Sequence, residues 1–540
     1  MPIDRRSLLA AFAAAGLAAP FLAGAAAAAE RPALLRVAKS SWPTTIDPQQ
    51  ISWVDQSEVV LLDYEGLTRL DSSLLPRPGA AESWTASEDG RTLTFTLREG
   101  LTYRDGTPLT AERFVFAFRR ATDPAVAAEL AGLLFVIKGA EQRASGDAAA
   151  DLGVRALDDR TVEFRLTRRA PYFPAVASLP IGFPVMEESL AGGPGWEFDP
   201  ARRIGNGRFA LDRVERDQLL GYRPNERYWE GPPRLGGIEF RIVPDTAVAF
   251  EAFAAGALDI AALAPQQVAT ALADAALAPR LISAATASTL WLTMNNAAAP
   301  FDDPKVREAF ARGLDRETLC QDLLGGSSRP ATGAVPPGIA GHIDSPSQAF
   351  DPGAARAALA ASTYGGPGDL PEIRLLFVNE DSAAVELVEW IAGNYRDVLG
   401  VELILDGRES SSFISAVSSP ETFPQIATLG WFADYADPQD FIELPFACGG
   451  AWAVNAGFCL PDLDAAIAAA EAEPDPAARA AAYERAGELL SAANVVVFLT
   501  HPLMFWLVQP GVAGITPTGF DLSLPGGFGS LGSMTIGPAA

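Results

Sequence analysis

Few residues in this sequence have the type and spacing that acid–base or metal chemistry requires. His342 and His501 are the only histidines among 540 residues. His342 lies in a Gly-rich loop, and His501 stands before a proline at the end of a predicted strand. Because zinc sites and His-assisted nucleophiles use paired or clustered histidines, we expect both to be structural. The sequence predicts no metal site and no cofactor.

One glycine pattern resembles a catalytic motif but lacks the surroundings that the motif needs. Gly527, Gly529 and Gly532 fit G-x-G-x-x-G, yet the chain ends at Ala540. That leaves no room for the helix and the acidic residue of a dinucleotide site. Pairs of acids occur elsewhere, but at expected turns and helix starts, where carboxylates satisfy backbone amides. We therefore predict no catalytic residues, and a protein that binds rather than an enzyme.

The chain has three cysteines with different surroundings. Cys448 and Cys459 bracket a Gly-rich loop, and an oxidising compartment would permit a local disulfide between them. Cys320 ends an apolar helix face, so we expect a buried free thiol there.

Charge and the first residues indicate the compartment and exclude one class of partner. A formal net charge of −26, without a run of Lys or Arg, is typical of proteins that do not bind nucleic acid. Arg5-Arg6-Ser7-Leu8-Leu9 precedes a short apolar run that ends in small residues at 27–29. These are the parts of a secretory signal, and they resemble a twin-arginine signal. We expect residues 1–29 to be removed, leaving a soluble periplasmic protein; a membrane anchor is the alternative.

Alternating apolar residues and helix caps predict the elements that position any site. The alternation predicts strands at Thr92–Arg98, Thr161–Leu166, Gly237–Val243 and Ser288–Met294. Caps predict helices that begin after Thr110, Asp303, Asp315 and Asp475.

The segment from 373 to 405 reads as a strand, a helix and a second strand. Ile373–Val378 is apolar, the helix is predicted over Ala383–Leu399, Gly400 can cap it in a left-handed conformation, and Val401–Leu405 follows. Such a βαβ unit implies two parallel strands. A further apolar strand is predicted at Val495–Leu499. Mixed helices and strands without an internal repeat predict an α/β architecture of more than one lobe.

Five sequence motifs occur one after another along the chain. They are 80–118, with Ala81-Glu82-Ser83-Trp84 and Asp105-Gly106-Thr107-Pro108; Gly205-Asn206-Gly207-Arg208-Phe209 with 225–229; Gly256-Ala257-Leu258-Asp259-Ile260; Met294-Asn295-Asn296 with 300–316; and Gly430-Trp431-Phe432-Ala433-Asp434-Tyr435-Ala436-Asp437-Pro438. Together they resemble the extracytoplasmic solute-binding proteins of family 5, the oligopeptide- and dipeptide-binding proteins of ABC importers.

The resemblance implies a two-lobed periplasmic binding protein of the α/β class, hinged like the type II proteins, with an extra domain inserted in the first lobe. On that basis we expect lobe I at 30–74, 186–285 and 501–540. The inserted domain is expected at 75–185 and lobe II at 286–500. Closure around a solute would be a hinge motion.

The resemblance also implies a site. In peptide-binding members the acid of the Trp-x-Ala-Asp-Tyr motif pairs with the α-ammonium of the peptide, and Asp434 matches that acid. The alternative role for Asp434 is structural, as a turn residue or a helix cap. Trp431, Ala433 and Tyr435 surround it, and Trp42 follows the first strand at a matching cleft position. These aromatic rings could stack on a ligand or belong to the core.

The function expected from the resemblance is the substrate-binding component of an ABC importer. Its partners would be a peptide or another amine-bearing solute and the membrane permease subunits, and the chain would act as a monomer. A sugar, an opine or a similar solute on the same fold is the first alternative. A periplasmic peptide hydrolase is the second, although no nucleophile–base pair is visible.

Overall fold

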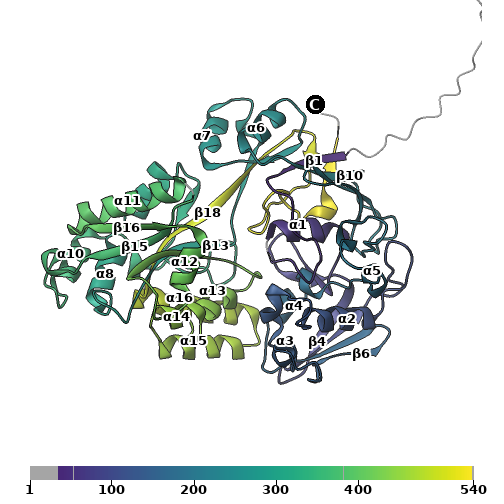
Figure 1. Cartoon of the computed structure of the whole chain (residues 1–540), viewed down its shortest axis with the longest axis horizontal. Helices are drawn as coiled ribbons and strands as arrows, with labels where there is room; N and C mark the ends of the chain where they lie inside the picture. Colours follow the sequence, from purple (N-terminus) through teal and green to yellow (C-terminus); the bar gives the residue numbers. More distant parts are fainter. Residues whose placement is uncertain (1–33, 53, 381, 538–540) are drawn as a thin grey trace, which may run out of the picture.

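The computed structural model describes residues 34–52, 54–380 and 382–537, and its elements form two bodies that lie side by side (Figure 1). The predicted signal at 1–29 lies outside these residues. Among the described residues, no helix combines the length and apolar character needed to cross a bilayer.

One large sheet runs through both bodies, in the order β16-β15-β17-β13-β18-β11-β1-β10-β9-β8, with β12 and β14 also paired to β18. Its strands are β1 Leu34–Lys39, β8 Phe209–Glu215, β9 Leu219–Pro224, β10 Gly237–Ile242, β11 Ile260–Ala262, β12 Leu281–Ala285, β13 Ser288–Met294, β14 Ser328–Pro330, β15 Ile373–Val378, β16 Leu403–Arg408, β17 Ile426–Phe432 and β18 Val496–Val508. We call the body built on β1 and β8–β12 the first lobe, and the body built on β13–β17 the second lobe.

The first lobe carries helices α1 Val54–Asp63, α6 Thr246–Ala254 and α7 Pro265–Ala273, the hairpin of β2 Thr68–Leu70 and β3 Pro76–Pro78, and the terminal pair β19 Val512–Ala513 and β20 Thr535–Ile536. A separate four-stranded sheet, β4-β5-β7-β6, forms the lower part of this side (Figure 1). It consists of β4 Ala81–Ala86, β5 Thr92–Leu97, β6 Val154–Asp158 and β7 Thr161–Arg165, and α2 Ala111–Ala121, α3 Ala140–Ala144, α4 Phe173–Val176 and α5 Glu187–Leu190 accompany it.

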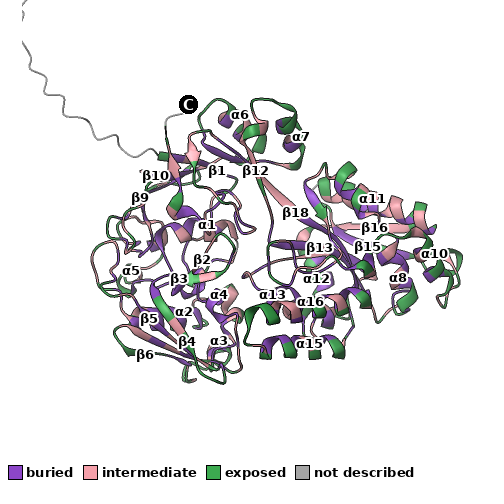
Figure 2. Ribbon diagram, turned by 180° about the vertical axis from the view of Figure 1, so that it is seen from behind, coloured by how far each residue is buried: buried purple, intermediate pink, exposed green. Residues whose placement is uncertain are grey.

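The second lobe is a sheet with helices on both faces. These are α8 Pro304–Arg312, α9 Arg316–Thr318, α10 Pro352–Ala360, α11 Ser382–Leu399, α12 Ser410–Val417, α13 Pro438–Phe446, α14 Ala451–Asn455, α15 Pro461–Ala472 and α16 Pro476–Ala493. Val496 and Phe498 face the core formed with α13–α16, whereas Val497 and Leu499 face the core formed with α8, α10 and α11. This alternation follows from the period of two in a strand that is covered on both faces. Figure 2 shows the buried helix faces turned inward and the exposed ones outward.

Strand β18 links the two lobes. It pairs with β13 from Val496 to Thr500 and with β12 from Leu503 to Leu507. The apolar run predicted a strand that ended at Leu499, because Pro502 usually ends or borders a strand. Pro502, which lacks an N–H, instead stands where β18 changes partner between the lobes, so the strand continues to Val508.

The chain also passes between the lobes from β12 to β13, at Ala285–Ser288. The two crossings lie beside the expected boundaries near 285 and 500, and the full set of domain boundaries stays a prediction. Paired crossing segments of this kind are where a hinge absorbs a change of angle between lobes.

The structure confirms most of the predicted elements. Strands β15 and β16 are parallel and are joined through α11, and Gly400 has φ +72°, as a left-handed cap requires. Asp303 and Asp475 accept backbone N–H bonds as N-caps. Thr110 occupies the predicted N-cap position, but its hydroxyl makes no capping bond.

Candidate ligand-binding cleft

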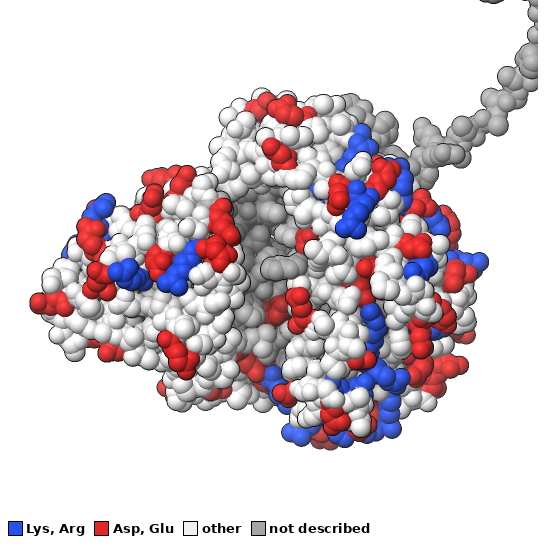
Figure 3. Space-filling view, in the orientation of Figure 1, with Lys and Arg blue, Asp and Glu red and all other residues white. Residues whose placement is uncertain are grey.

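A cavity of about 600 Å³ lies between the two lobes, and Figure 3 shows the hollow that leads to it. The two sides of the cleft contribute very different numbers of residues to its lining. One wall comes from the first lobe and the domain of β4–β7, through residues between 52 and 77, 130, 178–183, 207–208, 230–234 and 520–533. The opposite wall consists of Ala433, Asp434 and Tyr435.

The first wall is held in place by the Gly205-Asn206-Gly207 motif. The Asn206 side chain accepts the Glu65 N–H and donates to the Glu65 carbonyl, at 3.1 and 2.9 Å. A Cβ atom at Gly205 or Gly207 would lie within 2.5 Å of the Asp63 backbone. Only glycine therefore lets this loop clamp the chain at 63–65, where the wall begins.

The carboxylates of the first wall all have partners, and Arg234 is the one charged group of this wall, among the described residues, without an ion pair. Arg69 makes two hydrogen bonds to Glu230, at 3.0 and 3.1 Å, and Arg208 contacts the same carboxylate. The hydrogen bond from Arg69, with Arg208 beside it, lowers the pKa of Glu230 to about 2. Glu65 accepts from Tyr228 and Trp229. These charges are already compensated before any ligand arrives.

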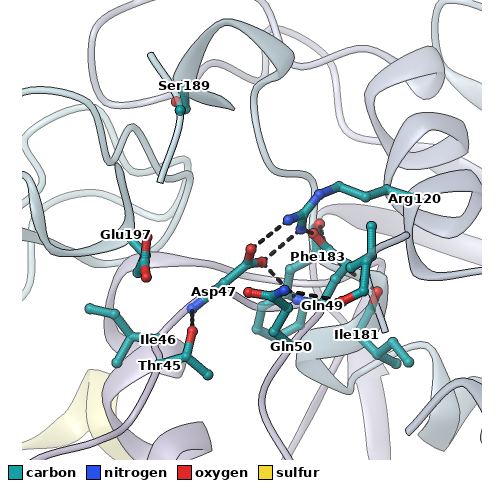
Figure 4. A network of polar contacts seen from close by, with 12 residues as sticks. Thr45, Ile46, Asp47, Gln49, Gln50, Arg120, Ile181, Phe183, Ser189 and Glu197 are labelled. Atoms are coloured by element: carbon teal, nitrogen blue, oxygen red, sulfur yellow. Dashed lines mark hydrogen bonds and ion pairs between the residues drawn. The ribbon is translucent and has the colours of Figure 1, made fainter. Parts of the chain in front are cut away.

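A buried ion pair fixes the part of this wall at 178–183. Arg120 of α2 donates to Asp47 at 2.7 Å and to Gln49 at 2.6 Å, and Gln49 in turn donates to the carbonyls of Ile181 and Phe183 (Figure 4). The network ties the first lobe to the domain of β4–β7 and presents Phe183 to the cavity.

The C-terminal segment completes the wall through two buried carboxyl groups. Glu58 accepts the N–H groups of residues 522–524, at 2.6, 2.6 and 3.2 Å. Asp521 accepts from Gly526 and Phe528, and burial raises its pKa to about 7. Gly529 packs against the backbone of Ser72, where a Cβ would lie at 2.7 Å. The glycines of this tail thus serve close packing beside the cavity.

Local structure explains why Asp434 faces the cavity. Strand β17 ends at Phe432, the Ala433 N–H donates to the Ala287 carbonyl at 2.8 Å, and Asp437 caps α13 ahead of Pro438. Residues 433–436 therefore form a short, fixed turn between a strand and a helix, and its middle lines the cavity.

The Asp434 carboxyl group has no hydrogen bond or ion pair with any residue in the described part of the chain. Burial raises its pKa to about 6. A buried carboxylate is costly without a partner, so a cationic group of a ligand is the chemistry that this position favours.

Tyr435 joins the two sides of the cleft instead of lying free in the cavity. Its ring stacks on Tyr172, with centroids 5.5 Å apart and 14° between the planes, and its hydroxyl donates to Gln439. Next to this stack, Arg168 forms an ion pair with Glu443 of α13 at 3.0 Å. This contact ties the domain of β4–β7 to the second lobe at one end of the cleft.

Two of the residues expected in the site lie elsewhere. Trp42 stacks on Phe198 within the first lobe, and Trp431 donates to the Asp440 carboxyl at 2.8 Å; neither lines the cavity. Trp431 stands on β17, and its indole N–H, which needs a partner when buried, turns toward the buried acid of α13.

Sequence reasoning missed the lining contributed by residues 520–533, because a Gly-rich tail without periodicity gives no strand or helix signal. Of the residues expected in the site, Ala433, Asp434 and Tyr435 meet at the cavity.

The cysteines and histidines pack away from this lining. A disulfide joins Cys448 to Cys459, with Cα atoms 4.4 Å apart, and Cys320 is a buried free thiol. His342 and His501 were expected to be isolated, but the fold places their rings 5.6 Å apart. Neighbours in space from distant segments carry no sequence signal. In the described ranges, no group of three or more potential ligands could hold a metal ion.

Two lobes joined by two crossing segments, with a cavity between them, define a solute-binding protein. The family model described as bacterial extracellular solute-binding proteins, family 5, matches residues 76–453. The chain belongs to this family.

Similar proteins share nearly the whole length. The periplasmic oligopeptide-binding protein OppA of Escherichia coli (strain K12) is 28% identical over 536 residues, covering 95% of this chain and 96% of the relative. The unliganded open form of MppA, a periplasmic murein tripeptide-binding protein, matches with a TM-score of 0.82 at 25% identity, covering 94% and 98%. Haemophilus influenzae OppA in complex with RPPGFSPFR matches at 0.71 and 25%, covering 94% and 99%.

Proposed function

We propose that this chain captures short peptides in the periplasm and delivers them to the permease subunits of an ABC importer, acting as a monomer. The observation that carries the peptide assignment is Asp434, a cavity carboxyl that pairs with no other residue in the described ranges. The relatives named above support the same reading, since their names describe peptide-binding proteins.

The proposed role of Asp434 is to bind the α-ammonium group of the peptide. Once the lobes have closed over the ligand, a charge-assisted hydrogen bond in the cavity contributes about 1.5–3 kcal/mol net. The same carboxylate left unpaired is unfavourable, so the site discriminates against ligands that lack a cationic end.

The opposite wall suits the remainder of a peptide. Its carboxylates are paired within the wall, and it offers backbone and apolar surface over residues 178–183 and 527–533. Main-chain pairing of an extended ligand holds it without reading its side chains. The boundaries of 30–74, 186–285 and 501–540 for lobe I, 75–185 for the inserted domain and 286–500 for lobe II are part of the proposal.

Native mass spectrometry tests this function. The mature protein is incubated with an equimolar mixture of tripeptides, a monosaccharide and a disaccharide, and both the bound mass and the free pool are measured. We expect a bound tripeptide of intact mass and an unchanged pool. Preferential binding of a sugar would contradict the peptide assignment, and loss of tripeptide to shorter products would indicate the hydrolase alternative.

A further inference from the structure

A second carboxyl group lies directly behind Asp434. Asp440 stands in the first turn of α13 and is fully buried. Its Oδ2 accepts the Trp431 indole N–H at 2.8 Å and the backbone N–H of Asp434 at 3.2 Å. Its Oδ1 has no hydrogen-bond partner in the described part of the chain. The acid therefore supports the turn that holds Asp434, while half of its own hydrogen-bonding capacity is unused.

The cations near Asp440 are already committed to other acids. Arg479 makes two bonds to Asp437, at 2.7 and 2.8 Å, and one to Glu471 at 2.8 Å. Arg168 pairs with Glu443. Acids outnumber cations among the titratable groups around this end of α13, which are Asp434, Tyr435, Asp437, Glu443, Glu471, Tyr483, Tyr172, Arg168 and Arg479.

Two opposing effects decide the charge of Asp440. The N-terminus of α13 favours an anion, but that effect is modest and falls off within one turn. Full burial without a cation opposes the anion more strongly. Burial and the neighbouring Asp434 raise the pKa of Asp440 well above its ordinary value. Burial outweighs the helix N-terminus.

We propose that Asp440 holds a proton at neutral pH, so that the Asp434–Asp440 pair presents one negative charge to the cavity and selects a singly charged ammonium group. The inference rests on the proposed function, because it assigns Asp434 to the ligand. Asp440 acts through Asp434 and is a positioning residue that sets the charge of the site.

The pair makes capture of an amine sensitive to pH. The Asp434 pKa of about 6 in the empty cavity lies above its ordinary value, so acidification removes the charge that an ammonium needs. The ammonium favours the ionised form and lowers this pKa in the complex. Affinity for a free-amine peptide is therefore full above about pH 7 and falls as the pH drops through about 6, with release of up to about one proton on binding.

Infrared spectroscopy of the full mature chain at neutral pH reads the proton directly. The difference spectrum between wild type and D440N should contain the carbonyl band of one protonated carboxylic acid, and that band should persist in D434N. D462N is the matched control, because Asp462 is exposed on α15, and it should lose no such band. A D440N spectrum that loses only carboxylate bands would overturn the proposal.

Calorimetric titration with a free-amine tripeptide provides the second readout. The readout is the pH midpoint at which affinity is lost, because a change in the Asp434 turn alone alters the affinity but not the charge beside Asp434. If Asp440 is neutral in wild type, D440N removes no charge and the midpoint should stay near that of wild type. A midpoint lower by about one pH unit or more in D440N would mean that Asp440 carries a second charge in wild type, and would overturn the proposal. If D440N does not fold, the ¹³C carboxyl shift of Asp440 in labelled wild type answers the question: a carboxylate shift at neutral pH contradicts the proposal.

The outcomes separate this inference from the proposed function. If Asp434 does not bind the ammonium, N-acetylation of the peptide costs no affinity, whereas the protonated band of Asp440 remains. If Asp440 is ionised, the band is absent, whereas N-acetylation still costs affinity.

Discussion

The two walls of the cleft differ in whether their carboxylates have partners within the protein. On the first wall Arg69 and Arg208 share Glu230, and Tyr228 and Trp229 satisfy Glu65. On the second wall Asp434 has no partner in the described residues, although it is half-buried. Among the described residues, each carboxylate of the first wall has a partner without a ligand, and the carboxylate of the second wall does not. A ligand cation would supply that partner.

This comparison shows why a count of charged residues does not locate a binding site. The first wall contributes more charged side chains to the cavity, but paired groups gain little from a ligand because they would have to give up existing partners. An unpartnered carboxylate can pair with a ligand cation without breaking an existing interaction. The binding site is thus identified by a polar group without a partner and not by the number of charged side chains.

The largest effect is expected from breaking the ion pairs behind the second wall. R479M leaves Asp437 buried without its cation and Glu471 with only the more distant Arg168, at 3.9 Å, and the free energy of unfolding should fall by about 3–5 kcal/mol. Urea unfolding followed by tryptophan fluorescence measures it. R485M, which removes an exposed arginine from the same helix, should change stability by less than about 0.5 kcal/mol. An R479M protein as stable as R485M would show that this network does not support the wall.

A smaller loss is expected on the first wall when its C-terminal segment loses its anchor. E58A removes the acceptor of three backbone N–H groups and should lower the free energy of unfolding by about 2–3 kcal/mol. E58Q keeps one oxygen as an acceptor and should cost clearly less. The two variants are compared by thermal unfolding and by hydrogen exchange of residues 522–524. Equal protection of these amides in E58A and wild type would contradict the anchoring role.

The smallest effect is expected from the exposed pair of the first wall. Glu230 is 40% exposed, so E230Q should alter stability by less than about 1 kcal/mol. Affinity for a free-amine tripeptide should change by less than about threefold, because this carboxylate is already matched by two arginines. Calorimetry checks both walls in one series. A loss of affinity in E230Q as large as that in D434N would mean that the ligand ammonium binds at the first wall, which would contradict the assignment to Asp434.

The sequence predicted the elements better than it predicted the site. Strand β13, the βαβ unit of β15, α11 and β16, and the caps at Asp303 and Asp475 were predicted because local patterns determine them. The extension of β18 past Pro502 was not, since the partner of its second half lies more than 200 residues away. Tertiary pairing overrode a local stop signal.

The motif after β17 places three of the expected site residues at the cavity, and their role in binding stays a prediction. Ala433, Asp434 and Tyr435 are adjacent, so one motif locates all three. Trp42 and Trp431 were assigned by position alone, and a ring can rotate into the core without changing the sequence pattern. The pairing of Arg69 with Glu230 and the isolation of Asp434 depend on distances that only the folded chain defines.

The most direct measurement is a calorimetric cycle that combines wild type and D434N with a tripeptide and its N-acetylated form, at about pH 7.5 so that Asp434 is ionised. Wild type should bind the free amine about 10–100-fold more tightly than the acetylated form, and D434N should bind both about equally, a coupling of about 1.5–3 kcal/mol. Equal losses for both peptides in D434N, with coupling near zero, would contradict the assignment of the ligand ammonium to Asp434.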